Sequence, residues 1–158
     1  MKADRHLLIK IFMILFLAAY LCLLCLSDST RNLPIEQLAS ALEAGGNTAA
    51  LEKQNKAGLK RFYQLEESDT DGYLFYKAAS PMAVDEVFVV KARSREDAGH
   101  FLELAEEHLR SQKRTFEGYG TTQMGLLNQA VVESKGIYTW YFCGEYADTL
   151  RQQLLARI

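Results

Sequence analysis

The chain has 158 residues and a formal net charge of −2, and 49% of its residues are hydrophobic. Three of its cations, Lys2, Arg5 and Lys10, stand before residue 11 with Asp4 as the one acidic neighbour, so the rest of the chain is more acidic than the whole. Such a chain lacks the basic surface that binds nucleic acids, and we expect no nucleic-acid partner.

The first predicted element is an apolar run from Leu7 to Leu26 (LLIKIFMILFLAAYLCLLCL), in which Lys10 is the one charged residue. A run of about 18 or more apolar residues is typical of a membrane-spanning helix. Because lysine and arginine accumulate on the cytoplasmic side, residues 1–27 are predicted to be a cytoplasmic tail and a signal-anchor helix. This predicts a single-pass cell-membrane protein with an extracytoplasmic C-terminal domain. A cleaved signal peptide is the alternative, and the sequence leaves cleavage open.

The cysteines do not indicate a cofactor or metal site. Cys22 and Cys25 lie within the apolar run, where cysteines behave as small hydrophobic residues. A lipid-attachment cysteine would follow small residues, and a redox pair would need a polar setting. Cys143 alone remains in the polar part of the chain, so no internal disulfide can form there, and we expect it to be buried and inert. We expect no cofactor and no metal.

Residues 28–34 read as a polar linker, and Pro34 then opens a helix over 35–44 that Gly45 ends. A second, irregular helical pattern runs from Thr48 to about Tyr63 and contains Gly58, which is unfavourable in a helix. Residues 73–77 and 84–92 are rich in aromatic and β-branched residues and predict two strands, which a short loop joins as an antiparallel hairpin.

Ser94 begins the clearest helix, because it approximates a capping box with Asp97 and precedes an apolar stripe that includes Leu109. Thr121 or Thr122 caps a shorter helix that continues through Val131 and ends at Gly136. Residues 137–143 predict a third strand and the C-terminal residues a last helix. Three strands with these helices predict an α+β domain over residues 35–158, with two layers: a small antiparallel sheet covered on one face.

Residues 67–72 (ESDTDG) resemble the start of a calcium loop, but the twelfth position is Ala78 where such a loop needs glutamate, so a plain turn is favoured. His100 and His108 lie too far apart on one helix to share an ion, and His6 precedes the apolar run, so we interpret all three as solvated surface residues.

Asp85 and Glu86 are adjacent on the second strand and therefore point to opposite faces of the sheet. A carboxylate that faces the helices would be informative, while the alternative is a pair of solvated carboxylates at the strand end. The strands are also rich in aromatic residues, which fill a core or, on an uncovered face, contact a partner.

Four segments together resemble a known family: Asp85-Glu-Val-Phe-Val-Val-Lys91, residues 110–116 (RSQKRTF), Gly118-Tyr119, and residues 128–136 (NQAVVESKG). In this order they are similar to a bacterial family catalogued as a domain of unknown function, family 4358, which is common in predicted lipoproteins and membrane-anchored proteins. The resemblance extends from about Ile35 to Leu155. It implies an anchored extracytoplasmic domain with no assigned activity, so no catalytic residue is carried over.

The sequence thus favours a noncatalytic binding or scaffolding module of the bacterial cell envelope, whose partner is an envelope protein or a cell-wall component. Its candidate functional surface comprises Asp85, Glu86, Tyr119 and Asn128. Two alternatives stay open: an envelope hydrolase that uses Asp85 or Glu86, and a structural subunit of a membrane complex. A cleft that holds either carboxylate beside another titratable group would favour the enzyme.

Overall fold

The computed structural model describes residues 2–27 and 30–158, with side chains described for residues 9–22 and from residue 30 onward. The chain divides into two units, Met1–Thr30 and Arg31–Ile158. Residues 28–29 of the expected linker and the side chain of Cys25 lie outside the described part. The first unit consists of helix α1 (Lys2–Ser27).

The prediction of a membrane-spanning signal-anchor, and with it the single-pass membrane localisation, is wrong. Among the residues that the structure describes, none of the helices combines the length and the hydropathy that a membrane crossing requires.

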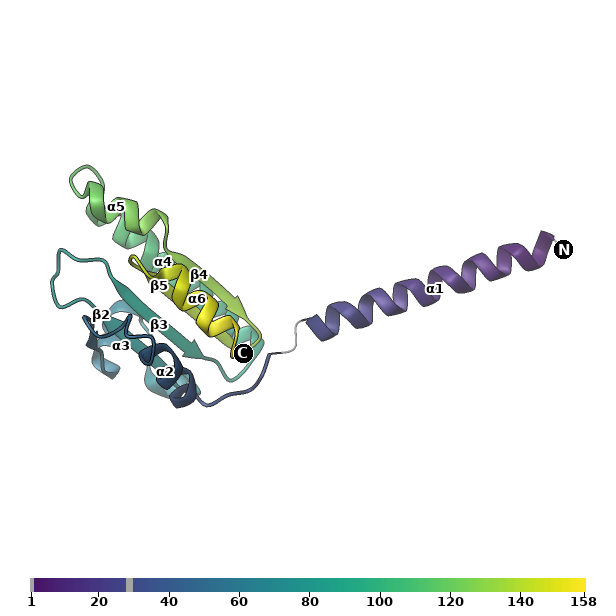
Figure 1. Cartoon of the computed structure of the whole chain (residues 1–158), viewed down its shortest axis with the longest axis horizontal. Helices are drawn as coiled ribbons and strands as arrows, with labels where there is room; N and C mark the ends of the chain where they lie inside the picture. The colour runs from purple at the N-terminus through teal and green to yellow at the C-terminus, as the bar shows by residue number, and fades with distance from the viewer. Residues whose placement is uncertain (1, 28–29) are drawn as a thin grey trace. The chain divides into compact units, whose positions relative to one another are not determined.

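The second unit is built on a five-stranded antiparallel sheet, where the sequence predicted three strands (Figure 1). Its order is β1-β2-β3-β5-β4. The strands are β1 (Glu52–Lys53), β2 (Tyr73–Lys77), β3 (Glu86–Lys91), β4 (Val131–Lys135) and β5 (Tyr138–Cys143). The predicted β2–β3 hairpin is confirmed, with Lys77 opposite Glu86 and Tyr73 opposite Val90.

Helices cover both faces of this sheet, so the predicted two-layer arrangement is wrong as well (Figure 1). One face packs against α3 (Lys56–Tyr63), α4 (Arg95–Phe116) and α5 (Thr121–Asn128). The other packs against α2 (Ile35–Glu43) and α6 (Ala147–Leu155). A short 3-10 helix, η1 (Glu67–Asp69), precedes β2.

The central strand β3 shows why both faces must be covered. All six of its residues are buried, with Phe88 and Val90 in the core on the α3–α4 side and Val87 and Val89 in the core on the α2–α6 side. A strand covered on both faces has a nearly continuous apolar sequence instead of strict alternation. β3 fits this pattern except at its two ends, where Glu86 and Lys91 stand.

Two predicted helices are shorter than expected. The segment from Thr48 begins with a turn that leads into strand β1. Helix α3 starts only after Asn55, whose side chain accepts hydrogen bonds from the amides of Ala57 and Gly58 at 2.9 and 3.3 Å. This N-cap fixes the helix start at Lys56, eight residues later than predicted.

The helix after Gly120 ends at Asn128, and Val131–Lys135 is strand β4. Gly136 does not end a helix. It has φ +63° in the two-residue connection from β4 to β5, at the position where a type II′ hairpin turn needs positive φ. The start of α4 is confirmed, because the hydroxyl of Ser94 accepts from the amide of Asp97 at 3.0 Å.

Candidate functional site

The functional candidates Asp85 and Glu86 lie at the start of β3, on opposite sides of the sheet. Glu86 points toward α3 and α4, where its carboxylate contacts Tyr63 and His108. Asp85 precedes the strand and lines a pocket with Val87 and Leu150 of the α2–α6 side. The pleat of the strand produces this separation, as the sequence predicted.

Glu86 belongs to a row of polar groups across the sheet. Lys77 of β2 is directly opposite it on one side, and Cys143 of β5 is directly opposite it on the other. Residues at paired positions have their side chains on the same face and about 5 Å apart. The register of the three strands therefore brings an ammonium, a carboxylate and a thiol together.

The carboxylate of Glu86 is 1% exposed and has three polar contacts in the described structure. Lys77 Nζ donates to Oε2 at 2.6 Å, and His108 Nε2 lies 3.2 Å from the same oxygen. The hydroxyl of Tyr63 donates to Oε1. A buried charge is tolerated when it is paired and hydrogen-bonded in this way.

Aromatic rings hold the Glu86 partners in place. Tyr63 stacks on Phe88, with ring centroids 3.9 Å apart and planes at 16°. The ring of His108 lies 4.7 Å from that of Tyr63 and 5.4 Å from that of Tyr141, the latter nearly perpendicular at 85°. His108 is therefore fixed in orientation by its neighbours as well as by Glu86.

The surroundings shift the pKa values of several groups in this cluster. Burial raises the pKa of Glu86, but attraction and hydrogen bonds from His108 and Lys77 outweigh burial and hold that pKa below its usual value of 4.5. Burial and the Glu86 charge raise the pKa of Tyr63 far above its usual range. Burial raises the pKa of the Cys143 thiol to about 11, so this cysteine is a neutral thiol. The nearby hydroxyl of Tyr141 makes no well-formed hydrogen bond with a described residue. Burial, followed by interaction with Cys143, raises the pKa of Tyr141 strongly.

Two cavities flank this cluster. One, of about 270 Å³, is lined by His108 and by Arg61, Phe62, Tyr63, Gln64, Leu104, Glu107, Ser111 and Gln112. The other, of about 380 Å³, receives Lys77 and shares Arg61, Phe62 and Gln112 with the first. Glu86 lines neither cavity. It contacts two groups, His108 and Lys77, that do.

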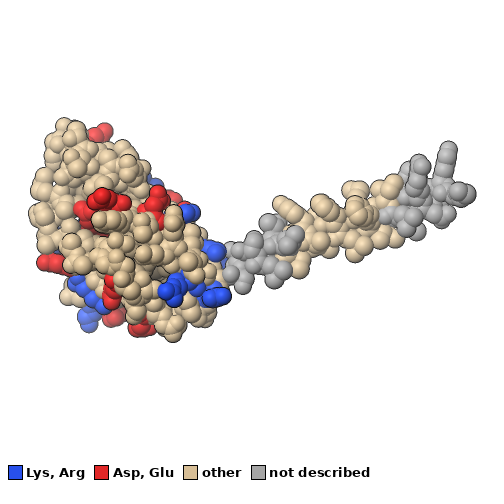
Figure 2. All heavy atoms as spheres, viewed as in Figure 1, with Lys and Arg blue, Asp and Glu red and all other residues tan. Residues whose placement is uncertain are grey.

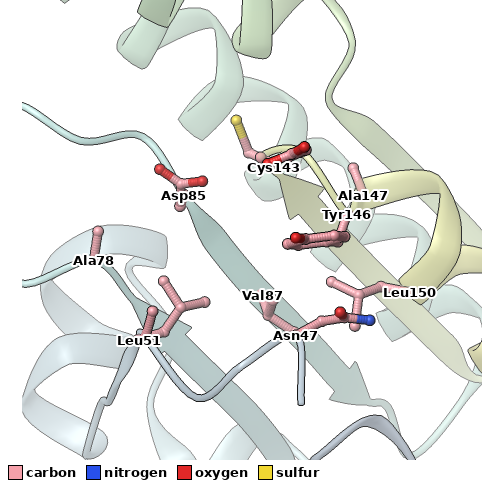
Figure 3. A pocket seen from close by; sticks show the side chains of 12 residues that line it. Asn47, Leu51, Ala78, Asp85, Val87, Cys143, Tyr146, Ala147 and Leu150 are labelled. Atoms are coloured by element: carbon pink, nitrogen blue, oxygen red, sulfur yellow. The ribbon is translucent and has the colours of Figure 1, made fainter. Parts of the chain in front are cut away.

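The pocket that contains Asp85 is shown in Figure 3 and has a volume of about 280 Å³. Its walls are mainly apolar, and its polar side chains come from Asn47, Asp85, Cys143, Glu145 and Tyr146. The carboxylate of Asp85 makes no hydrogen bond or ion pair with any residue that the structure describes.

The backbone at Gly144 fits closely against Asp85. Gly144 has φ +127°, and a Cβ placed on it would lie 2.6 Å from Asp85 Oδ1. Glycine is therefore needed here both for the left-handed conformation and for the close approach of the carboxylate. The turn between β5 and α6 thus helps to shape this pocket.

Tyr119 and Asn128 lie together but apart from the two carboxylates. They line one open cavity of about 400 Å³ between the end of α4 and α5, with neither Asp85 nor Glu86 in its lining. Tyr119 is 62% exposed. The four sequence-predicted site residues are therefore distributed over three separate places.

Sequence reasoning missed Tyr63, Lys77 and His108. His108 was interpreted as a solvated residue, but it is 6% exposed. The signal was the spacing along α4: the buried residues Ala98, Phe101, Ala105 and His108 follow at intervals of three or four, and Leu109 is only half-buried. Extending that stripe by one step would have placed the histidine in the core.

Residues 67–72, which resemble the start of a calcium loop, include a 3-10 helix and an ion-paired aspartate. Glu67–Asp69 forms the 3-10 helix, and Asp71 is paired with Lys91 at 2.6 Å. In the described part of the chain, no group of three or more histidine, cysteine or acidic residues is arranged to hold a metal ion.

The face in Figure 2 carries both acidic and basic side chains.

Comparison with known proteins places the chain in a family without adding an activity. No curated protein and no solved structure matches it. A family model matches residues 43–144, from the end of α2 to the residue after β5, and so covers Asp85, Glu86 and the partners of Glu86. The match supports the family resemblance seen in the sequence and carries no membrane or lipoprotein assignment. The chain belongs to the family described as Domain of unknown function (DUF4358).

Proposed function

We propose that this domain is a noncatalytic binding module that holds a positively charged group of a partner protein in the pocket at Asp85. The observation that supports this proposal is the half-buried carboxylate of Asp85, which has no partner among the described residues (Figure 3). A carboxylate withdrawn from water gains free energy from a cation with which it can pair.

The charges around the pocket favour a cation. Glu145 is a second acidic residue in its lining, and no lysine, arginine or histidine is among the lining residues. Leu51, Val87 and Leu150 provide apolar walls for the aliphatic stem of a basic side chain. The ring of Tyr146 adds an aromatic face of the kind that attracts cations.

The size of the pocket favours a single side chain over a large ligand. Its volume of about 280 Å³ is at the lower limit of small-molecule sites, which range from roughly 300 to 1,000 Å³. A lysine or arginine side chain that enters from a protein partner fits this volume. A free small amine has the same chemistry and is the other source of such a group.

The state of the nearby reactive groups supports the noncatalytic part of the proposal. Cys143 is the nucleophilic side chain in the Asp85 pocket, and burial raises its pKa to about 11. Glu86 is enclosed by its donors and lines neither flanking cavity. The enzyme alternative would have Glu86 act through His108, and the contact between them is the observation that favours it.

Binding of lysine peptides to the full chain tests the proposal by NMR titration. We expect short peptides that contain lysine to shift the amides of Val87 and Leu150, and the same peptides with norleucine to leave them unchanged. Asp85→Asn should weaken binding at least tenfold. Asp148→Asn is the matched control, because Asp148 is exposed in the first turn of α6 but does not line the pocket.

The Asp148→Asn variant also controls for a loss of helix stability, because an acidic residue in the first turn of a helix stabilises that helix without any ligand. If Asp85→Asn and Asp148→Asn weaken peptide binding equally, the pocket is not the site. If N-acetyl-lysine amide binds as tightly as the peptides, the source of the cation is a small amine instead of a protein partner.

A further inference from the structure

Strand β4 forms one edge of the sheet, and its outer side is unpaired. It pairs with β5 on one side, and no strand of the described chain lies on the other (Figure 1). Val132 packs against the core on the α3–α4 side and Val131 against the core on the α2–α6 side, so both faces of the strand are in use. What remains for a partner is the backbone along its outer edge.

The register shows which backbone groups of β4 point outward. On the β3 side of β5, the carbonyl of Ile137 accepts a hydrogen bond from a backbone amide at 2.7 Å. Successive residues of a strand direct their backbone groups to opposite sides, so Tyr138 bonds to Lys135, its partner on β4. Alternate residues of β4 therefore bond to β5. Those between them, Val132 and Ser134, direct their N–H and C=O groups outward, where no described residue pairs with them.

The opposite edge of the sheet offers much less. It is formed by β1, which has only the two residues Glu52 and Lys53. Very short edge strands are one of the ways in which proteins prevent unwanted strand pairing. With five residues, β4 has the length of an ordinary strand. It is therefore the edge to which a further strand can add through backbone hydrogen bonds.

The charged side chains of β4 match a second copy of the same strand. Glu133 and Lys135 are two residues apart and so lie on one face of the sheet. Glu133 Oε2 accepts from Arg151 at 2.8 Å, while its other oxygen has no described partner. Lys135 makes no ion pair with a described residue. If two β4 strands run antiparallel with Ser134 opposite Ser134, each Glu133 lies opposite the Lys135 of the other copy.

We propose that the chain forms a two-fold symmetric dimer in which β4 pairs with β4 of a second copy, with the axis at Ser134. The two sheets then become one continuous sheet across an isologous interface. The two Ser134 residues exchange both backbone hydrogen bonds, and a Glu133–Lys135 pair lies on each side of them. Opposite charges in directly opposed positions stabilise a sheet. The dimer is independent of the function proposed for the Asp85 pocket, because Asp85 precedes β3.

The charges also decide the register. Outward-pointing groups must face outward-pointing groups, which allows an axis within the strand at residue 132, 133 or 134. An axis at Glu133 puts two carboxylates directly opposite each other, which is unfavourable. An axis at Val132 puts Glu133 opposite Val131 and leaves Lys135 without an acidic partner. The axis at Ser134 is the one that pairs every charge of the strand.

Disulfide cross-linking of the full chain tests both the occupant and the register. Residues in a hydrogen-bonded antiparallel pair have Cα atoms about 5.5 Å apart, within the range of a disulfide. Ser134→Cys should therefore give a covalent dimer on oxidation with copper phenanthroline. Val132→Cys is the matched control on the same face of the strand, because its two copies are offset by roughly 14 Å. The native Cys22, Cys25 and Cys143 are present in every chain, so the wild type gives the background, including any association through α1.

Charge reversal tests the proposed ion pairs in equilibrium sedimentation of the full chain. Lys135→Glu should raise the dissociation constant of the dimer at least tenfold, and adding Glu133→Lys should restore most of the affinity, because the pair is then reversed. Lys53→Glu makes the same charge change on the other edge strand and should alter the constant less than twofold.

Three results would overturn the proposal. The first is a cross-linking yield for Ser134→Cys that does not exceed that of Val132→Cys. The second is an equal effect of Lys135→Glu and Lys53→Glu on dimerisation. The third is a full chain that stays monomeric at high micromolar concentration, which would leave the edge of β4 to an extended segment of another protein.

Discussion

Replacement of Glu86 by glutamine should strongly destabilise the second unit. The substitution keeps the size of the side chain but removes the negative charge that pairs with Lys77 at 2.6 Å. It also leaves the Lys77 ammonium without an acidic partner, in a position where that side chain is 13% exposed. The buried hydroxyl of Tyr63 loses a charged acceptor at the same time.

The expected loss of unfolding free energy follows from the burial of the Glu86–Lys77 ion pair. Removing one partner of a buried ion pair costs about 3–5 kcal/mol. Because Lys77 lines the larger flanking cavity and keeps some hydration, we expect the lower end, about 3 kcal/mol. For a domain of this size, that corresponds to a fall in melting temperature of roughly 10 °C.

Urea unfolding followed by the fluorescence of Trp140 measures this loss. Trp140 is the one tryptophan of the chain and is 1% exposed, so its emission reports the loss of the core. With a slope of about 2 kcal/mol per molar urea, the midpoint should fall by about 1.5 M at an unchanged slope. Glu103→Gln removes the same charge from an exposed position on α4 and should leave the midpoint unchanged.

A double variant separates the charge effect from general disruption. Adding Lys77→Met to Glu86→Gln removes the unpaired ammonium and should recover part of the lost stability. If Glu86→Gln shifts the midpoint no more than Glu103→Gln does, the cluster does not contribute to stability as its burial implies. If Lys77→Met destabilises the Glu86→Gln variant further, the lysine stabilises the fold for a reason other than its charge.

Other predictions follow from individual residues. His108 and Lys77 hold the pKa of Glu86 below 4.5 against the effect of burial. The ionised Glu86 therefore contributes its full stabilisation of the fold above pH 4.5, and this contribution is lost as the pH falls through the lowered pKa of the folded state. Urea midpoints measured from pH 6 down to pH 3 should thus fall more steeply for the wild type than for Glu86→Gln. Gly144→Ala should cost about 1–3 kcal/mol in urea unfolding, because of its positive φ and its contact with the Asp85 carboxylate. Gly99→Ala, in a helix where a Cβ meets open space, should stabilise by about 1 kcal/mol. Peptide mapping after iodoacetamide treatment at pH 8 should show Cys143 unmodified in the folded chain and alkylated in urea, because its pKa is about 11; alkylation of the native form would contradict this.

The sequence predicted the elements that have strong local signals. The cap at Ser94, the aromatic and β-branched residues of β2, β3 and β5, and the short loop between β2 and β3 were sufficient to place them. Weaker signals led to errors where a tertiary contact decides the structure. Val131–Lys135 alternates too little to stand out as a strand, and it becomes one by pairing with β5 through the turn at Gly136.

The candidate site was predictable only in part. Adjacency on a strand is enough to separate Asp85 from Glu86, since it depends on local geometry alone. The partners of Glu86 come from two helices and from another strand, 9 to 23 residues away along the chain. Contacts of that kind depend on strand register and helix placement, which one sequence does not reveal. The same limitation explains why the uncovered face expected for a two-layer fold does not exist here.

The two carboxylates at the start of β3 are joined by a single peptide bond, and this constrains how the family can vary. Inserting one residue between Glu86 and Val87, with the rest of β3 kept in register, would reverse the direction of both side chains, so that the paired acid would face the Asp85 pocket and the free acid would enter the core. Such a length change would therefore disable two distant surfaces at once. Variation in the Ala78–Val84 connection should accordingly stop short of this dipeptide.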